Sequence, residues 1–170
     1  MARISYPDLS NPTIAPTVER IVAERGRVLK LYEMLLHSPP VAAGWLSFLT
    51  AIRQQGQLSG RIRELTIMRV AVINGAEYEF RAHTPFALKE GVSQLQIDAL
   101  REGRFDSFDA VERVVLEYTD SMTRNVQVPD AVFEAVRLHF NERELVELTA
   151  TIGAYNLVSR FLEALQVDHD

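Results

Sequence analysis

Glu79 and His83 stand four residues apart in a segment whose composition favours a helix. On a helix this spacing places both side chains on one face, close enough to form a hydrogen bond. A carboxylate beside an imidazole orients the ring and selects its tautomer, which is the usual arrangement of a histidine that acts as an acid or a base. An ordinary surface pair at the same spacing is the commoner outcome, so the pair alone marks only a candidate site.

Glu64 is a third candidate, because it lies near the start of a strongly apolar segment. A carboxylate there either lies at the polar edge beside Arg61 and Arg63, or is buried with a partner. Arg69 lies in the same segment and is a possible partner for a buried carboxylate. Tyr78 either lines a pocket or anchors its helix in the core.

Several other kinds of site are excluded or disfavoured by the sequence. The chain has no cysteine, which rules out disulfides, thiolate nucleophiles and thiolate metal sites. No glycine-rich phosphate loop, serine nucleophile elbow or paired zinc pattern is present. Helical bundles that bind iron or manganese through carboxylates repeat a Glu–His spacing of three residues, whereas this chain has one such pair, spaced by four. We therefore expect no metal and no cofactor.

The elements that must position these residues are predicted to be helices. The hydrophobic pattern has a helical period nearly throughout and no stretch alternates as a strand does, so we predict an all-α bundle. Residues 1–16 hold three prolines and predict an irregular arm. Helices are expected over residues 17–37 (divided at Gly26), 41–55, 60–73, 76–90, 93–101, 109–124, 129–140 and 142–165.

Some helix boundaries carry specific signals. Ser59 is a candidate N-cap, and Ser93 with Gln96 forms a candidate capping box. Pro85 falls inside the predicted helix that carries Glu79 and His83. Because proline removes one backbone donor and crowds the preceding turn, we expect a kink close to His83.

One short sequence recurs. Residues 63–65 and residues 143–145 both read Arg-Glu-Leu and both open an apolar helix. A duplicated helical hairpin is a possible explanation, although three matching residues are a short repeat.

Composition indicates an ordinary soluble protein. The chain has 170 residues, of which 47% are apolar and 24% charged, which suits a single domain over residues 1–170. A net charge of −5 argues against nucleic-acid binding. No apolar run approaches the roughly 18 residues of a membrane span, and the first residues contain no apolar signal core. We therefore expect a cytoplasmic protein with no nucleic-acid or membrane partner.

The spacing of the candidate residues resembles the carboxymuconolactone decarboxylase and alkyl hydroperoxide reductase D superfamily. In its peroxidase branch a Glu is followed, after eleven residues, by a Cys-x-x-Cys pair and then, after three more, by a His. Glu64 matches that Glu and His83 that His, while Ala76 and Glu79 occupy the two cysteine positions. Tyr78 matches the tyrosine often found before the second cysteine.

The departure from the pattern restricts the activity. Thiols do the chemistry in the peroxidase branch, so a chain with Ala76 and Glu79 at their positions cannot run a dithiol peroxidase cycle. The decarboxylase branch also lacks the cysteine pair and carries a Glu four residues before a His, which Glu79 and His83 resemble. The likeness is most specific over residues 58–100, and it implies the all-α fold of this superfamily.

The resemblance implies a cofactor-free lyase or isomerase that acts on a small carboxylated lactone or a related acid. His83 would move the proton, Glu79 would orient the ring and tune its charge, and Glu64 would complete the relay. Arg69 or Arg81 would meet a substrate carboxylate.

Two further expectations accompany this reading. The resemblance implies a homo-oligomer, either a dimer, a trimer or a hexamer. The alternative is a non-catalytic oligomerising or small-ligand-binding protein in which Glu64, Glu79 and His83 form a structural polar core. Convergence of the three side chains on a pocket open to solvent favours the enzyme, whereas a sealed network favours the alternative.

Overall fold

The computed structural model describes residues 1–170, and all its regular elements are helical, so the predicted all-α fold is confirmed. The elements are α1 (Ala15–Arg25), α2 (Lys30–Leu35), α3 (Pro39–Thr50) with a π-helical turn η1 (Ala51–Gln55), α4 (Gly60–Asn74), α5 (Glu77–Lys89), α6 (Gln94–Glu102), α7 (Ala110–Arg124), α8 (Asp130–Arg137) and α9 (Glu142–Leu165). None of these helices combines the length and the apolar character that crossing a bilayer requires.

The chain divides into two compact units. The first unit comprises residues 1–55 and 161–170, and the second comprises residues 56–160. The first therefore holds α1, α2, α3 and the last residues of α9, and the second holds α4 to α8 with most of α9. Every candidate site residue lies in the second unit.

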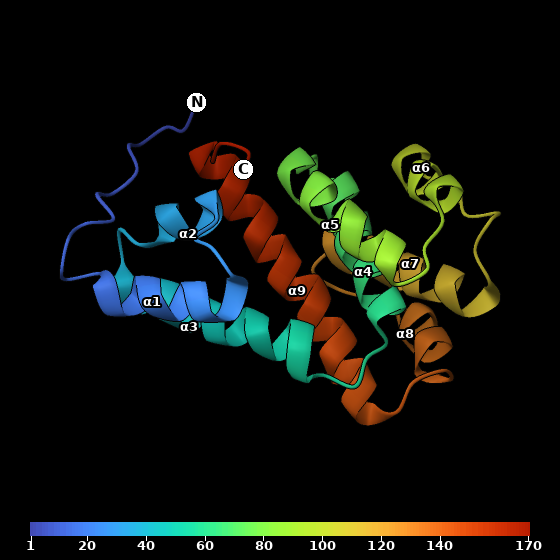
Figure 1. Ribbon diagram of the computed structural model, residues 1–170. Coiled ribbons are helices and arrows are strands. Elements are labelled where there is room, and N and C mark those ends of the chain that lie inside the picture. The colour runs from blue at the N-terminus through green and yellow to red at the C-terminus, as the bar shows by residue number, and fades with distance from the viewer. The chain divides into compact units, whose positions relative to one another are not determined.

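The central helix of the second unit is α4, which packs against α5, α6 and α7 (Figure 1). Every residue from Glu64 to Ala71 is buried, as expected for a helix that is apolar over most of its circumference. Arg61 bonds Glu112 and Arg69 bonds Asp120, each across 51 positions. Because the separation is the same for two pairs eight residues apart along the chain, α4 and α7 run in the same direction.

A short turn joins α4 to α5. Gly75 ends α4 with a φ of 67°, in the left-handed region that glycine adopts most readily. Only Gly75 and Ala76 separate the two helices, and so short a connection makes them antiparallel neighbours. This hairpin brings the middle of α5, with His83, beside the first half of α4, with Glu64.

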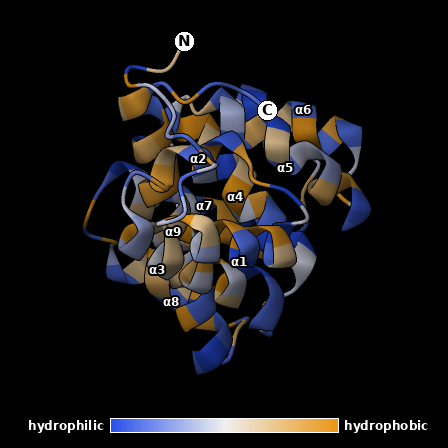
Figure 2. Ribbon diagram, turned by 60° about the vertical axis from the view of Figure 1, so that its left-hand side comes forward, coloured by the Kyte–Doolittle hydropathy of each residue, from blue (hydrophilic) through white to orange (hydrophobic).

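The predicted caps are confirmed. The hydroxyl of Ser59 accepts a hydrogen bond from the backbone N–H of Ile62, and Ser93 with Gln96 forms a complete capping box. Blue and orange residues alternate along α6 in Figure 2, as expected for a helix with one face in the core. The apolar core of the second unit contains Leu65, Met68, Ala71, Ala76, Phe80, Ala87, Val92, Ile97, Ala99, Leu100, Phe108 and Leu116.

Some boundaries differ from the predictions. Pro39 and Pro40 open α3 rather than precede it, because proline lacks only a donor that the first helical turn leaves unpaired. The helix predicted over 129–140 ends at Arg137. Gly26, with a φ of 80°, does divide the first predicted helix.

The two Arg-Glu-Leu segments occupy different environments. Glu64 is buried and faces α5, whereas the carboxylate of Glu144 accepts a hydrogen bond from the backbone N–H of Asn141 at the start of α9. The glutamates of the two copies therefore have different roles, and a duplicated hairpin stays a prediction.

Candidate active site

Glu64, Glu79 and His83 come together in the interior of the second unit. Nδ1 of His83 lies 2.6 Å from Oε2 of Glu64, and its Nε2 lies 3.6 Å from Oε2 of Glu79. The exposed fractions of Glu64, Glu79 and His83 are 1%, 4% and 4%. The helical spacing of four residues aligns Glu79 with His83 on α5, and the α4–α5 hairpin supplies Glu64 from the other side.

The two nitrogens of His83 have different partners. At 2.6 Å the Nδ1–H donates a hydrogen bond to the carboxylate of Glu64, and this bond fixes the orientation and the tautomer of the ring. At 3.6 Å the contact between Nε2 and Glu79 is an electrostatic one, longer than a hydrogen bond. Nε2 is therefore the nitrogen placed to exchange a proton with a third group.

Further charge and aromatic contacts surround this group. Nε of Arg63 lies 3.3 Å from Oε1 of Glu64 and places a positive charge beside the carboxylate. The ring of Tyr155, on α9, stands edge-on to the imidazole, with ring centroids 5.1 Å apart. Phe86, one turn after His83 on α5, lies with its ring centroid 5.8 Å from that of the imidazole.

The two positions that match cysteines are occupied very differently. Ala76 is 1% exposed and belongs to the apolar core of the second unit. Glu79 instead directs a carboxylate at His83. The first position thus contributes only to packing, while the second contributes an ionisable group to the candidate site.

Arg69 is occupied by other partners. Its Nε and Nη2 donate to the two carboxylate oxygens of Asp120, each at 2.5 Å, and its Nη1 donates to the carbonyl of Leu100. Its guanidinium also lies over the ring of Phe105, 4.8 Å from the centroid. The guanidinium of this buried arginine is therefore already occupied, and its contact with substrate stays a prediction.

Arg81 and Tyr78, the other two predicted substrate-binding residues, occupy opposite environments. Arg81 is exposed and donates from Nε to Glu77 at 2.7 Å. Tyr78 is 6% exposed and lies within the core of the second unit. Their contacts with substrate also stay predictions.

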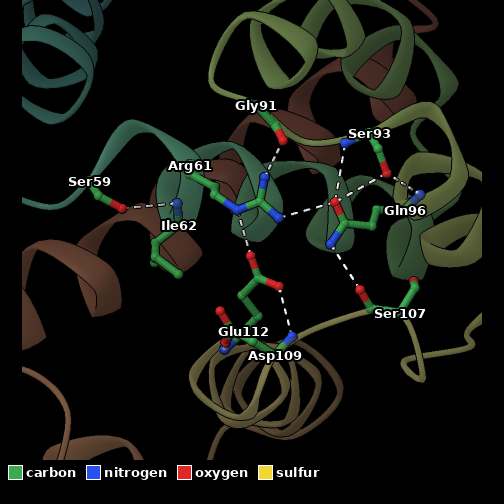
Figure 3. Close-up of polar contacts among 9 residues, drawn as sticks. All are labelled: Ser59, Arg61, Ile62, Gly91, Ser93, Gln96, Ser107, Asp109 and Glu112. Atoms are coloured by element: carbon green, nitrogen blue, oxygen red, sulfur yellow. Dashed lines mark hydrogen bonds and ion pairs between the residues drawn. The ribbon is translucent and has the colours of Figure 1, made fainter.

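Arg61 forms a polar network that the sequence did not predict (Figure 3). It donates from Nε to Glu112 at 2.6 Å, from Nη1 to the carbonyl of Gly91, and from Nη2 to Gln96 at 3.1 Å. Gln96 and Glu112 are also the third residues of the capping boxes that start α6 and α7. Arg61 therefore ties the first turn of α4 to three other segments, one turn before Glu64.

Glu77 lies at the start of α5 in a cluster with two arginines. Arg101 donates to both of its carboxylate oxygens, at 3.0 and 2.9 Å, and Arg81 donates at 2.7 Å. The hydrogen bonds from Arg101 and Arg81 lower the pKa of Glu77 to about 2. The guanidinium of Arg101 also stacks over Phe80, 3.8 Å from the ring centroid.

Replacement of Glu77 by glutamine should lower the free energy of unfolding by about 1 kcal/mol at pH 7, after solvent screening of this partly exposed group. The pKa of Glu77 is lower in the folded than in the unfolded chain, so its contribution is present above about pH 5 and is lost as pH falls toward 2. Urea unfolding of both proteins between pH 7 and pH 3 should show the difference shrinking. Glu117→Gln, at an exposed position of α7, is the control; a difference independent of pH contradicts the prediction.

A groove of about 790 Å³ lies elsewhere in the second unit, between α8 and the start of α9. Glu64, Glu79 and His83 do not line it. Its walls are formed by Phe133, Arg137, Phe140, Asn141, Glu142, Leu145, Val146, Thr149 and Ala150. No group of three or more histidine, aspartate or glutamate side chains has an arrangement that could hold a metal ion.

Comparison with known proteins shows a family likeness in the part of the chain that holds this site. The model of the carboxymuconolactone decarboxylase family matches residues 39–121, a stretch that includes Glu64, Glu79 and His83. The uncharacterized protein YdfG of Bacillus subtilis (strain 168) is 29% identical over 115 residues, which cover 66% of this chain and 78% of YdfG.

Two solved structures share the fold. An uncharacterized peroxidase-related protein from Silicibacter sp. TM1040 aligns with a TM-score of 0.84 at 20% identity, over 99% of this chain and 92% of that protein. A protein of unknown function from Agrobacterium tumefaciens, provisionally assigned as the antioxidant defence protein AhpD, aligns with a TM-score of 0.73 at 25% identity, over 79% of this chain and 93% of that protein. Together with the matching site residues, these likenesses show that the chain, which has no cysteine, has the fold of AhpD-like proteins and is similar over residues 39–121 to the carboxymuconolactone decarboxylase family.

Proposed function

We propose that this protein is a cofactor-free lyase or isomerase that acts on a small carboxylated lactone or a related acid. One observation carries the proposal: a buried imidazole lies between two buried carboxylates, 2.6 Å from one and 3.6 Å from the other. Because titratable groups are seldom buried without a purpose, such a cluster is a candidate for proton transfer. The proposal includes the absence of dithiol peroxidase activity, since the protein carries no thiol.

In the proposed reaction His83 carries the proton. Loss of carbon dioxide from a lactone acid breaks a carbon–carbon bond and leaves its electron pair on the substrate, delocalised into the lactone. Nε2–H of the imidazolium donates its proton to a substrate carbon that carries this electron pair. Water returns a proton to the ring afterwards. For an isomerisation, Nε2 first removes a proton from carbon and then returns it at another carbon.

The carboxylates have distinct parts in this scheme. Glu64 accepts the Nδ1–H bond and stabilises the positive charge on the ring, as a positioning residue that acts through His83. Glu79 faces Nε2 and is placed to orient a water molecule or to act as a second acid–base group. Burial strengthens both electrostatic interactions, because little water is present to screen them.

The same burial favours a second candidate function. With at most 4% of each side chain exposed, the three residues also suit a non-catalytic protein whose polar core fixes the packing of α4 on α5. We also propose that the protein is a cytoplasmic homo-oligomer. For the non-catalytic candidate, this oligomer is the functional form and converts no substrate.

Carbon dioxide release from a panel of carboxylated lactones distinguishes the two candidates. We expect release with the wild-type protein, also after dialysis against EDTA, and loss of release in His83→Ala. His139→Ala, which changes an exposed histidine in the turn after α8, should keep full activity. The proposal is overturned if no lactone acid or related acid is decarboxylated or isomerised, or if His83→Ala turns over at the wild-type rate.

A further inference from the structure

The imidazole of His83 has one aromatic neighbour in the interior and one at the surface. Tyr155 is 2% exposed and stands edge-on to the ring, at an interplanar angle of 89°. Phe86 is 45% exposed, and its ring is tilted by 49° to the imidazole. His83 itself is only 4% exposed, so the half-exposed Phe86 ring lies between the imidazole and solvent on this side.

The helix places the ring of Phe86 over His83. Side chains on a helix lean toward its N-terminus, so a residue covers the surface of the turn that precedes it. Phe86 follows His83 by three residues and therefore covers it, as the 5.8 Å between the ring centroids confirms. Because Phe86 is 45% exposed, its ring has solvent on one side, into which it can rotate.

The backbone at this point is also less constrained than the rest of α5. Pro85 lies inside the helix, immediately before Phe86. It has no N–H to donate to the carbonyl of Arg81, so one hydrogen bond of this turn is missing. A turn with one bond fewer permits the displacement of Phe86 at a lower cost than a regular turn.

We propose that Phe86 is the gate that admits ligands to His83, and that it selects small acids that present an apolar ring face. The selection follows from charge: Glu64 and Glu79 already bring two carboxylates to the imidazole, and Arg63 is the one arginine beside them. A further carboxylate is repelled there, so an acid enters with its apolar ring toward His83 and in place of the Phe86 ring. The catalytic consequence rests on the proposed function, whereas the gating itself does not.

Chemical modification of histidine measures this access without a substrate. Diethyl pyrocarbonate reacts with an accessible, unprotonated imidazole nitrogen, and peptide mass spectrometry gives a separate rate for each histidine. In the wild-type protein His83 should react at least about tenfold more slowly than the exposed His139. In Phe86→Ala the rate at His83 should rise about tenfold while that at His139 stays unchanged.

Two other variants complete the test. Leu88→Ala removes an equally exposed apolar side chain from the same helix and should leave the rate at His83 unchanged. Phe86→Trp, with a larger ring, should slow the modification, which tests the gate even if Phe86→Ala folds poorly. Equal rates at His83 and His139 in the wild-type protein, or an unchanged rate at His83 in both Phe86 variants, overturn the gate.

The modification rate of His83 tests the gate whether or not the protein converts a substrate. A faster modification of His83 in Phe86→Ala supports the gate even when no lactone acid is converted. Conversely, an enzyme that converts lactone acids but shows no effect of Phe86 on modification retains the proposed function and loses the gate.

Discussion

Replacing His83 by glutamine should lower kcat/KM for the lactone acid by about 10² to 10⁴, the usual contribution of a positioned acid–base group. Glutamine has nearly the size of histidine and keeps a polar group between α4 and α5, so the variant tests proton transfer rather than packing. The measurement is the rate of carbon dioxide release under conditions where the substrate is limiting. His139→Gln, at an exposed position, is the matched control.

Glu64 acts through His83, so the effect of replacing Glu64 should depend on the presence of the imidazole. Glu64→Gln keeps an acceptor for Nδ1–H but removes the charge that stabilises the imidazolium, and we expect a fall of about 10 to 10² in kcat. The double variant should be about as slow as His83→Gln alone, because a positioning residue has nothing to position once the imidazole is gone.

A different pattern would assign different roles. If the effects of the two replacements multiply, Glu64 contacts the substrate independently of His83. If His83→Gln retains the wild-type rate while its circular dichroism is also unchanged, the acid–base role of His83 is wrong and the structural polar core is the better explanation.

The sequence predicted the elements that are determined locally. The last helix was predicted at 142–165 and is observed with the same bounds, and the caps at Ser59 and at Ser93 with Gln96 are also confirmed. These features depend on residues within a few positions of one another, so their signals are complete in the sequence. The spacing of Glu79 and His83 belongs to the same class, since one turn of α5 determines it.

Contacts between distant segments were not predictable in the same way. Arg69 was a possible partner for a buried carboxylate, but the carboxylate that it binds, Asp120, could not be identified because it depends on the parallel packing of α7 against α4. The network of Arg61 with Glu112 depends on the same packing. The sequence left open whether Glu64 meets His83, because their contact depends on how the α4–α5 hairpin aligns the two helices.

Arg61→Met should lower the free energy of unfolding by about 2 to 4 kcal/mol, the largest stability effect that we expect from one surface-accessible arginine of this chain. The side chain of Glu112 is 4% exposed and keeps only one other hydrogen-bond partner, the backbone N–H of Asp109, once the guanidinium is removed. A buried carboxylate without its counter-charge carries most of the cost, and the carbonyl of Gly91 loses a donor as well. Urea unfolding at pH 7 measures the change.

A double-variant cycle separates the pair from the rest of the network. Glu112→Gln removes the charge but keeps an acceptor for the capping bond of Asp109, so Arg61→Met in that background should cost about 1 to 3 kcal/mol less than in the wild-type protein. Arg104→Met, which breaks an exposed pair with Glu102, should change stability by less than about 1 kcal/mol. An equally small effect of Arg61→Met would show that the capping boxes alone hold these helix ends.

The same network connects stability to the candidate site. Arg61 precedes Glu64 by one turn of α4, and its partner Gly91 follows the end of α5, the helix that carries Glu79 and His83. Loss of the network should therefore loosen the hairpin that sets the 2.6 Å contact between Glu64 and His83. Hydrogen exchange of the amides in α4 and α5 should accelerate in Arg61→Met before global unfolding. Acceleration confined to α6 and α7 would show instead that the hairpin is held by its apolar core alone.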